Sequence, residues 1–125
     1  MQLHRIVDET AGIVCATITG EIRLGPILEE MSRITSEPSF DPNLPVLVDL
    51  RQATSSMTAD EILTLTQSIK HNPKTPREGR RALLVSTELM YGLYRMFEAF
   101  SADGPVAYRA FESEKEAREW LVRPS

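Results

Sequence analysis

The chain has 125 residues, of which 42% are hydrophobic and 26% are charged, and its net charge is −4. These values are ordinary for a globular protein with one core, so we expect one domain over residues 1–125. The negative charge argues against nucleic acid as a partner, because binding to nucleic acid depends on basic contacts to phosphate.

The location is predicted from three further features. Cys15 is the single cysteine and lies in the apolar run Ile13–Ala16, which favours a buried filler over a reactive thiol and fits a reducing compartment. No apolar signal core follows Met1, and no apolar stretch approaches the roughly 20 residues of a membrane-spanning helix. We therefore expect a cytoplasmic protein that does not span the membrane.

The first third of the chain predicts a hairpin and a helix. Residues 3–7 and 13–19 alternate between apolar and polar, and Gly12 between them suits a positive φ. We expect Gly20 to end the second strand. Helical spacing then runs from Leu24 to about Ser36, with Pro26 tolerated because it falls in the first turn.

The middle of the chain predicts a buried strand and a capped helix. The short apolar run Val46–Leu50 is typical of a strand that is buried on both faces, and we expect a loop over 52–57. Thr58 and Glu61 form the pattern of a capping box, and Asn72-Pro73 ends the helix. Residues 74–81 are polar and basic, which predicts a solvated, flexible segment.

The last third predicts two more strands and two more helices. Residues 82–86 form a short apolar strand, and apolar residues recur at helical spacing from Glu88 to about Ala102. A strand over 106–111 and a helix capped by Ser113 follow. The order ββαβαβαβα predicts an α/β fold, with a mixed five-stranded sheet and four helices.

This order, together with three segments, resembles the SpoIIAA-like branch of the STAS (sulfate transporter and anti-sigma factor antagonist) superfamily. The segments are Val46-Leu-Val-Asp-Leu-Arg51, Tyr91-Gly-Leu-Tyr-Arg-Met-Phe-Glu98 and Phe111-Glu-Ser-Glu-Lys-Glu-Ala-Arg-Glu-Trp-Leu121. The resemblance implies a non-catalytic regulatory module that binds a protein, such as a regulatory kinase or another sigma-regulatory protein. A similarity in layout to CRAL-TRIO domains implies the alternative, a carrier or sensor of a small apolar or lipid-like ligand.

Typical anti-sigma factor antagonists are switched by phosphorylation of a serine in an Asp-Ser-Ser/Thr-Gly motif. The corresponding position falls at or near Thr58, where this sequence has Met57-Thr58-Ala59-Asp60 instead. We therefore expect no such switch. A phosphate on Thr58, Ser55 or Ser56 would meet a helix N-terminus, but capping alone accounts for a threonine there.

The remaining candidate contacts are Asp49 and Arg51 at the end of the buried strand, and Tyr91, Tyr94 and Arg95 on the helix from Glu88. The pair on the strand either contacts a ligand or partner, or satisfies the following loop. The residues on the helix either form a contact surface, most simply of a homodimer, or widen the buried stripe.

Catalysis has little support in the sequence. The two histidines, His4 and His71, have no partner at a metal-binding spacing, and no nucleophile elbow or phosphate-binding glycine loop is present. We therefore expect no enzyme activity, no metal and no cofactor.

Overall fold

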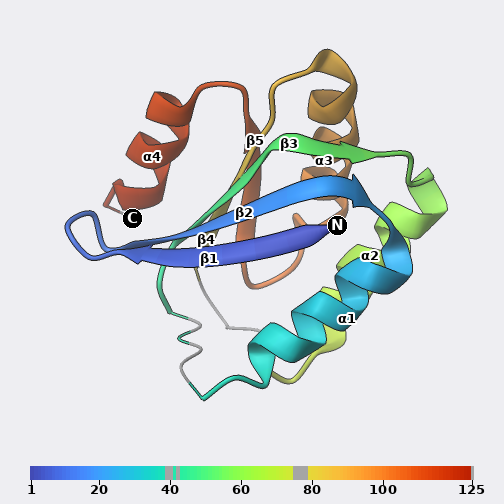
Figure 1. Cartoon of the computed structure of the whole chain (residues 1–125), viewed down its shortest axis with the longest axis horizontal. Coiled ribbons are helices and arrows are strands. Elements are labelled where there is room, and N and C mark those ends of the chain that lie inside the picture. The colour runs from blue at the N-terminus through green and yellow to red at the C-terminus, as the bar shows by residue number, and fades with distance from the viewer. Residues whose placement is uncertain (39–40, 42, 75–78, 125) are drawn as a thin grey trace.

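The computed structural model describes residues 1–38, 41, 43–74 and 79–124 (Figure 1). Within these residues the elements follow the predicted order. The strands are β1 (Gln2–Asp8), β2 (Ile13–Ile22), β3 (Val46–Ser55), β4 (Arg80–Leu84) and β5 (Ala107–Phe111). The helices are α1 (Leu24–Thr35), α2 (Ala59–His71), α3 (Glu88–Phe100) and α4 (Glu114–Val122). The predicted α/β fold with a mixed five-stranded sheet and four helices is confirmed.

The sheet has the spatial order β1-β2-β3-β4-β5, which is also the order of the strands along the chain. β1 is antiparallel to β2, and each later strand is parallel to the one before it. Parallel crossovers are nearly always right-handed, so three crossovers that step in one direction place α1, α2 and α3 on one face. α4 packs on the other face, and Figure 1 shows it apart from α1 and α2.

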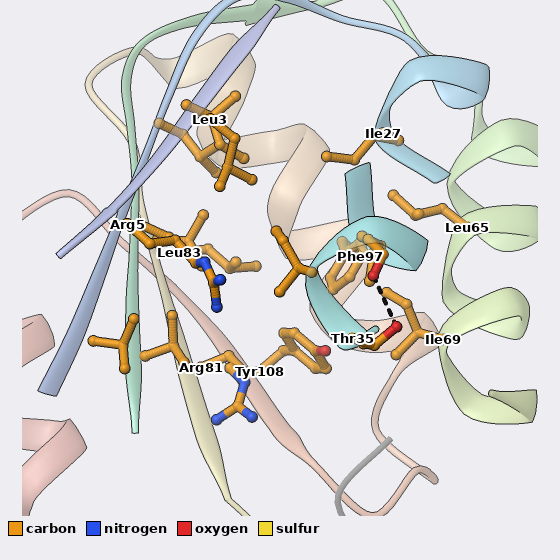
Figure 2. A pocket seen from close by; sticks show the side chains of 18 of the residues that line it. Leu3, Arg5, Ile27, Thr35, Leu65, Ile69, Arg81, Leu83, Phe97 and Tyr108 are labelled. Carbon is orange, nitrogen blue, oxygen red and sulfur yellow. Dashed lines mark hydrogen bonds between the residues drawn. The ribbon is translucent and has the colours of Figure 1, made fainter. Parts of the chain in front are cut away.

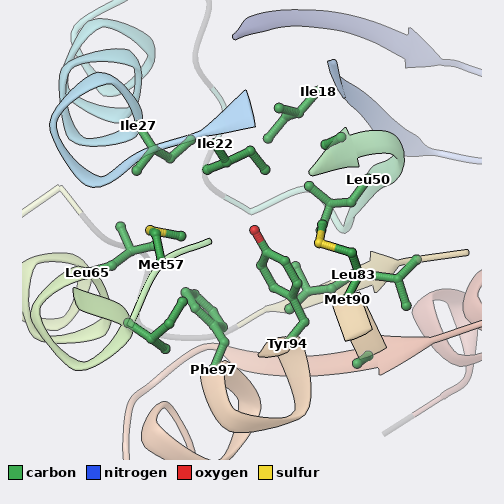
Figure 3. Close-up of a cluster of buried hydrophobic side chains, with 14 residues drawn as sticks. Ile18, Ile22, Ile27, Leu50, Met57, Leu65, Leu83, Met90, Tyr94 and Phe97 are labelled. Atoms are coloured by element: carbon green, nitrogen blue, oxygen red, sulfur yellow. The ribbon is translucent and has the colours of Figure 1, made fainter. Parts of the chain in front are cut away.

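A large core fills the helical face and a smaller one lies under α4. The large core joins residues of β2, β3 and β4 to side chains from α1, α2 and α3, including Ile27, Leu65, Tyr94 and Phe97 (Figure 3). The smaller core comprises Ile13, Leu47, Ala82, Leu84, Phe111, Ala117 and Leu121, with Cys15 and Trp120 against it. Cys15 thus packs against the smaller core, although it is only partly buried and not fully buried as predicted.

Hydroxyl groups cap three of the helices. The Thr58 hydroxyl accepts from the Glu61 N–H at 3.2 Å, and a Glu61 carboxylate oxygen accepts from the Thr58 N–H at 3.1 Å. This reciprocal pair confirms the predicted capping box of α2. The Thr87 hydroxyl caps α3 and the Ser113 hydroxyl caps α4. Each accepts one hydrogen bond from a backbone N–H of its helix.

The structure corrects two predicted strand ends. Gly20 does not end β2: it has a φ of +86°, and the strand continues to Ile22 after a shift of register between Thr17 and Thr19. β3 continues to Ser55, through most of the predicted loop. The two extensions pair with each other, because residues 20–22 of β2 lie opposite residues 53–55 of β3. Glycine permits the positive φ without the strain that a side chain would add.

The predicted flexible basic segment is also partly wrong. Arg80 and Arg81 belong to β4, and Arg81 is only 8% exposed. Arg80 donates to the carbonyl oxygens of Trp120 and Arg123, both at 2.6 Å, and so ties β4 to the end of α4. Residues 75–78 of the same prediction lie outside the described residues.

Candidate functional site

A cavity of about 410 Å³ lies between the sheet and helices α1, α2 and α3. Its sheet side is formed by inward-facing residues of all five strands, because alternate side chains of a strand share a face. These residues are Leu3, Arg5 and Val7 of β1, Val14, Ala16, Ile18 and Ile22 of β2, Val46, Val48 and Leu50 of β3, Arg81 and Leu83 of β4, and Tyr108 of β5. Figure 2 shows the strands on one side of the cavity and helices on the other.

The side chains of α1 that face the cavity are less buried in its second half than in its first. Ile27, in the first half of α1, is 7% exposed and belongs to the large core. Met31 and Ile34, one and two turns further on, are only partly buried, and all three residues line the cavity. The second half of α1 therefore covers a space that no side chain of the described residues fills.

The deep end of the cavity is apolar except for one hydroxyl group. Ile22, Leu50, Leu65 and Phe97 line this end and are all less than 9% exposed. Tyr94 is 5% exposed, and Figure 3 shows its hydroxyl directed toward Ile22. Burial raises the pKa of Tyr94, so the phenol stays protonated and can donate a hydrogen bond.

The other end of the cavity is polar and reaches solvent, since its lining residues Val7 and Asp41 are exposed. Arg5 and Arg81 line it, and Figure 2 shows both guanidinium groups on the side of Tyr108, away from Leu3. The cavity is thus an apolar chamber with two arginines at its mouth.

Each of these two arginines is fixed by contacts within the protein. Arg5 donates to the carboxylate of Glu37, which follows α1, and the two form an ion pair. Arg81 donates to the carbonyl oxygen of Leu44 at 3.0 Å. Burial lowers the pKa of Arg81, but a guanidinium remains charged in proteins at any ordinary pH.

The structure places Asp49 and Arg51 on the other face of the sheet from the cavity. Arg51 donates to Asp49 through Nε at 3.0 Å, through Nη2 at 2.8 Å and through its own backbone N–H at 3.0 Å. Arg51 also forms an ion pair with Glu114 of α4 at 3.1 Å. The hydrogen bonds from Arg51 lower the pKa of Asp49. Local satisfaction of the carboxylate accounts for the pair, and a ligand role for it stays a prediction.

The serine and threonine candidates have structural contacts. The Thr58 hydroxyl is engaged in the cap of α2. Ser55 donates to the carbonyl oxygen of Ile22 at 3.2 Å and accepts from the Met57 N–H at 3.3 Å. These two side chains therefore hold the junction between β3 and α2, whereas Ser56 is exposed.

The three candidates on α3 do not share one surface. Arg95 is exposed and donates to the Tyr91 hydroxyl at 3.1 Å, with its guanidinium 5.8 Å from the centre of the Tyr91 ring. Tyr94 points into the core and lines the cavity. Tyr94 thus follows the second alternative from the sequence, a widened buried stripe, because successive helical positions differ in direction by about 100°. A contact surface at Tyr91 and Arg95 stays a prediction.

Sequence reasoning expected an apolar ligand only through the similarity in layout to CRAL-TRIO domains, and it did not place Arg5 or Arg81 at a ligand site. A signal for Arg5 was present, since it alternates in phase with Leu3 and Val7 and so had to face inward with them. The signal for Arg81 was weaker, because Arg81 stands among other basic residues. The direction of its side chain follows only once the first residue of β4 is known.

Comparisons with known proteins support the fold. No protein-family model matches the chain, and no curated protein matches it by sequence. Among solved structures, the chain is similar to an uncharacterised protein of the DUF3478 family from Shewanella loihica PV-4, which has a SpoIIAA-like fold. The two are 17% identical, the match covers 96% of this chain and 92% of the other, and the TM-score is 0.57. The chain therefore has a SpoIIAA-like fold, as predicted.

Two features are absent from the part of the chain that the structure describes. None of the helices there is long and apolar enough to cross a membrane. Among the same residues, no group of three or more histidine, cysteine, aspartate or glutamate side chains is placed to hold a metal ion.

Proposed function

We propose that this domain binds a small apolar or lipid-like molecule in the cavity, as a carrier or sensor, without catalysing a reaction. One observation carries the proposal: an apolar cavity of about 410 Å³ lies inside a chain of 125 residues. Protein interiors are close-packed and leave few voids larger than a water molecule. The volume falls within the roughly 300–1,000 Å³ that is typical of ligand pockets.

The lining of the cavity supports binding without chemistry. Among the described residues that line it, Asp41 is the one carboxylate, and there is no histidine, cysteine or lysine. Apolar walls with a few polar groups at one place are typical of a ligand pocket. An acid-base or nucleophilic reaction needs paired groups, which these walls do not provide.

Native mass spectrometry after gentle purification tests this proposal. We expect a co-purifying small molecule, or saturable binding of a neutral apolar dye to the protein. The variant Ala16→Leu should fill part of the cavity and weaken binding, because Ala16 lines it. Ala107→Leu is the matched control, since Ala107 is exposed on β5. No bound molecule and no dye binding, in a folded protein, would contradict the proposal.

A protein-binding regulatory role is the second candidate. It is supported by an exposed part of α3, where Leu89 is 77% exposed and Tyr91 and Arg95 lie two and six positions further on. An exposed large apolar side chain, with tyrosine and arginine on the same helix, suits an interface. The expected partner is a second copy of the chain, and Leu89→Ser should lower the sedimentation coefficient if this homodimer forms. A wild-type monomer at high concentration would contradict the homodimer.

A further inference from the structure

We infer that the molecule bound in the cavity is an anionic amphiphile. Its acidic head group, a carboxylate or a phosphate, contacts Arg5 and Arg81 at the mouth, and its apolar chain fills the deep end. This inference rests on the proposed function and adds the chemical class of the ligand.

The position of the two charges is the first reason. Arg5 occupies an inward position of β1 between two apolar residues, and Arg81 is 8% exposed at an inward position of β4. Arginine is rarely buried, because removing its charge from water is unfavourable unless it is paired. Arg5 is paired with Glu37, and Arg81 donates to the carbonyl oxygens of Leu44 and Arg80. Both cations nevertheless line an otherwise apolar wall, so they are the groups of the cavity that attract an acidic ligand.

The shape of the guanidinium group is the second reason. It is planar and presents a fork of N–H donors that matches the oxygens of a carboxylate or a phosphate. A neutral head group, such as an alcohol or an ester, offers no charge to either arginine. The arrangement in Figure 2, with both guanidinium groups on one side of an apolar chamber, therefore distinguishes acids from neutral molecules of the same length.

The acidic groups near the mouth do not cancel this preference. Asp41 lines the cavity but is exposed, and it accepts from the Asn43 N–H at 3.0 Å. Glu37 pairs with Arg5, but it also forms an ion pair with Arg33 at 2.6 Å. When an acidic head group displaces Glu37 from Arg5, Glu37 keeps its contact with Arg33. Exchange of partners at Arg5 therefore leaves no carboxylate without a cation.

The test is a competition experiment with the purified full chain. A neutral fluorescent dye, N-phenylnaphthylamine, occupies the cavity and is displaced at neutral pH by dodecanoic acid, dodecyl phosphate or dodecanol. We expect the better of the two acids to bind about ten- to a hundredfold more tightly than the alcohol, as charge-assisted hydrogen bonds predict. Whether the carboxylate or the phosphate is the tighter of the two identifies the source of the head group.

Matched variants show whether the arginines are responsible. Arg5→Met keeps the length and the apolar contacts of the side chain, and we expect it to remove about tenfold or more of the affinity for the acid while dodecanol binds as before. Arg109→Met is the control, because Arg109 is an exposed arginine on β5 that lies over the ring of Phe111 of the smaller core. Arg81→Met is a second test, and Arg5→Met decides alone if Arg81→Met does not fold.

The outcomes separate this inference from the proposed function. Equal affinity for acid and alcohol in the wild type, or an acid affinity that Arg5→Met leaves unchanged, would overturn the inference and leave a neutral apolar ligand. Failure of the dye and of all three competitors to bind the folded protein would overturn the proposed function itself.

Discussion

Arg5 of β1 forms an ion pair with Glu37, two residues past the end of α1. The contact links the edge strand of the sheet to the helix whose second half covers the cavity. The carboxylate of Glu37 also competes with the acidic ligand that we assign to Arg5. One ion pair therefore links α1 to the sheet beside the mouth and also opposes binding of that ligand at Arg5.

Replacing Glu37 by glutamine should raise the affinity for an acidic ligand, because it removes the competing charge from Arg5. Dodecanoic acid should bind about two- to tenfold more tightly, and dodecanol should bind as before. The free energy of unfolding should fall by about 1 kcal/mol or less, since the pair is partly exposed. Glu119→Gln, which removes an exposed carboxylate from α4, is the control. Lower affinity for the acid in Glu37→Gln would show that Glu37 holds the site together instead of competing with the ligand.

Asp49 gives a prediction about pH. Arg51 lowers the pKa of Asp49 below its ordinary value of 3.8 in the folded protein. The carboxylate therefore stabilises the fold above pH 3.8, and this contribution is lost as the pH falls through the lowered folded value. Asp49→Asn should reduce the free energy of unfolding by about 1 kcal/mol at neutral pH, and less in acid. Urea unfolding at several pH values measures this. Unchanged stability with lost binding would make Asp49 a contact residue.

The sequence predicted the fold well because the elements carry local signals that agree with one another. Alternation identified the hairpin, a capping box marked the start of α2, and helical spacing marked α3. The strand ends were less predictable, since residues 53–55 of β3 are ordered by pairing with residues 20–22 of β2. That pairing joins segments more than thirty positions apart, and no local pattern reports it.

The cavity was not predictable, because it depends on how far α1 stands from the sheet. Met31 and Ile34 continue the apolar stripe that begins with Ile27, so the sequence predicts that all three pack equally. The structure buries only Ile27. The sequence left the direction of Tyr94 open for a related reason, since an apolar stripe with a tyrosine at its side does not show which side the core covers.

Two glycines should respond in opposite ways to alanine. Gly20→Ala should destabilise the protein by about 1–2 kcal/mol, because φ is +86°, a backbone conformation that strains a residue with a Cβ. Gly92→Ala should stabilise it by about 1 kcal/mol, because Gly92 is inside α3 and an added Cβ meets nothing within 4 Å. Thermal unfolding of both variants measures the difference. A neutral Gly20→Ala would show that the end of β2 adopts another backbone conformation in solution.

Thr58 should act through stability and not through phosphorylation. Thr58→Ala should lower the free energy of unfolding by about 0.5–2 kcal/mol, because it removes the oxygen that caps α2 and leaves the Glu61 N–H without that acceptor. Thr64→Ala is the matched control: Thr64 is exposed on the same helix and donates within it, so alanine there should be neutral or slightly stabilising. Phosphoproteomics of the native host should find no stoichiometric phosphate on Thr58, Ser55 or Ser56. A phosphate on Thr58 would remove the cap of α2 and would place a negative charge beside Asp60 and Glu61. Detection of this phosphate would contradict the prediction and would support a phosphorylation switch.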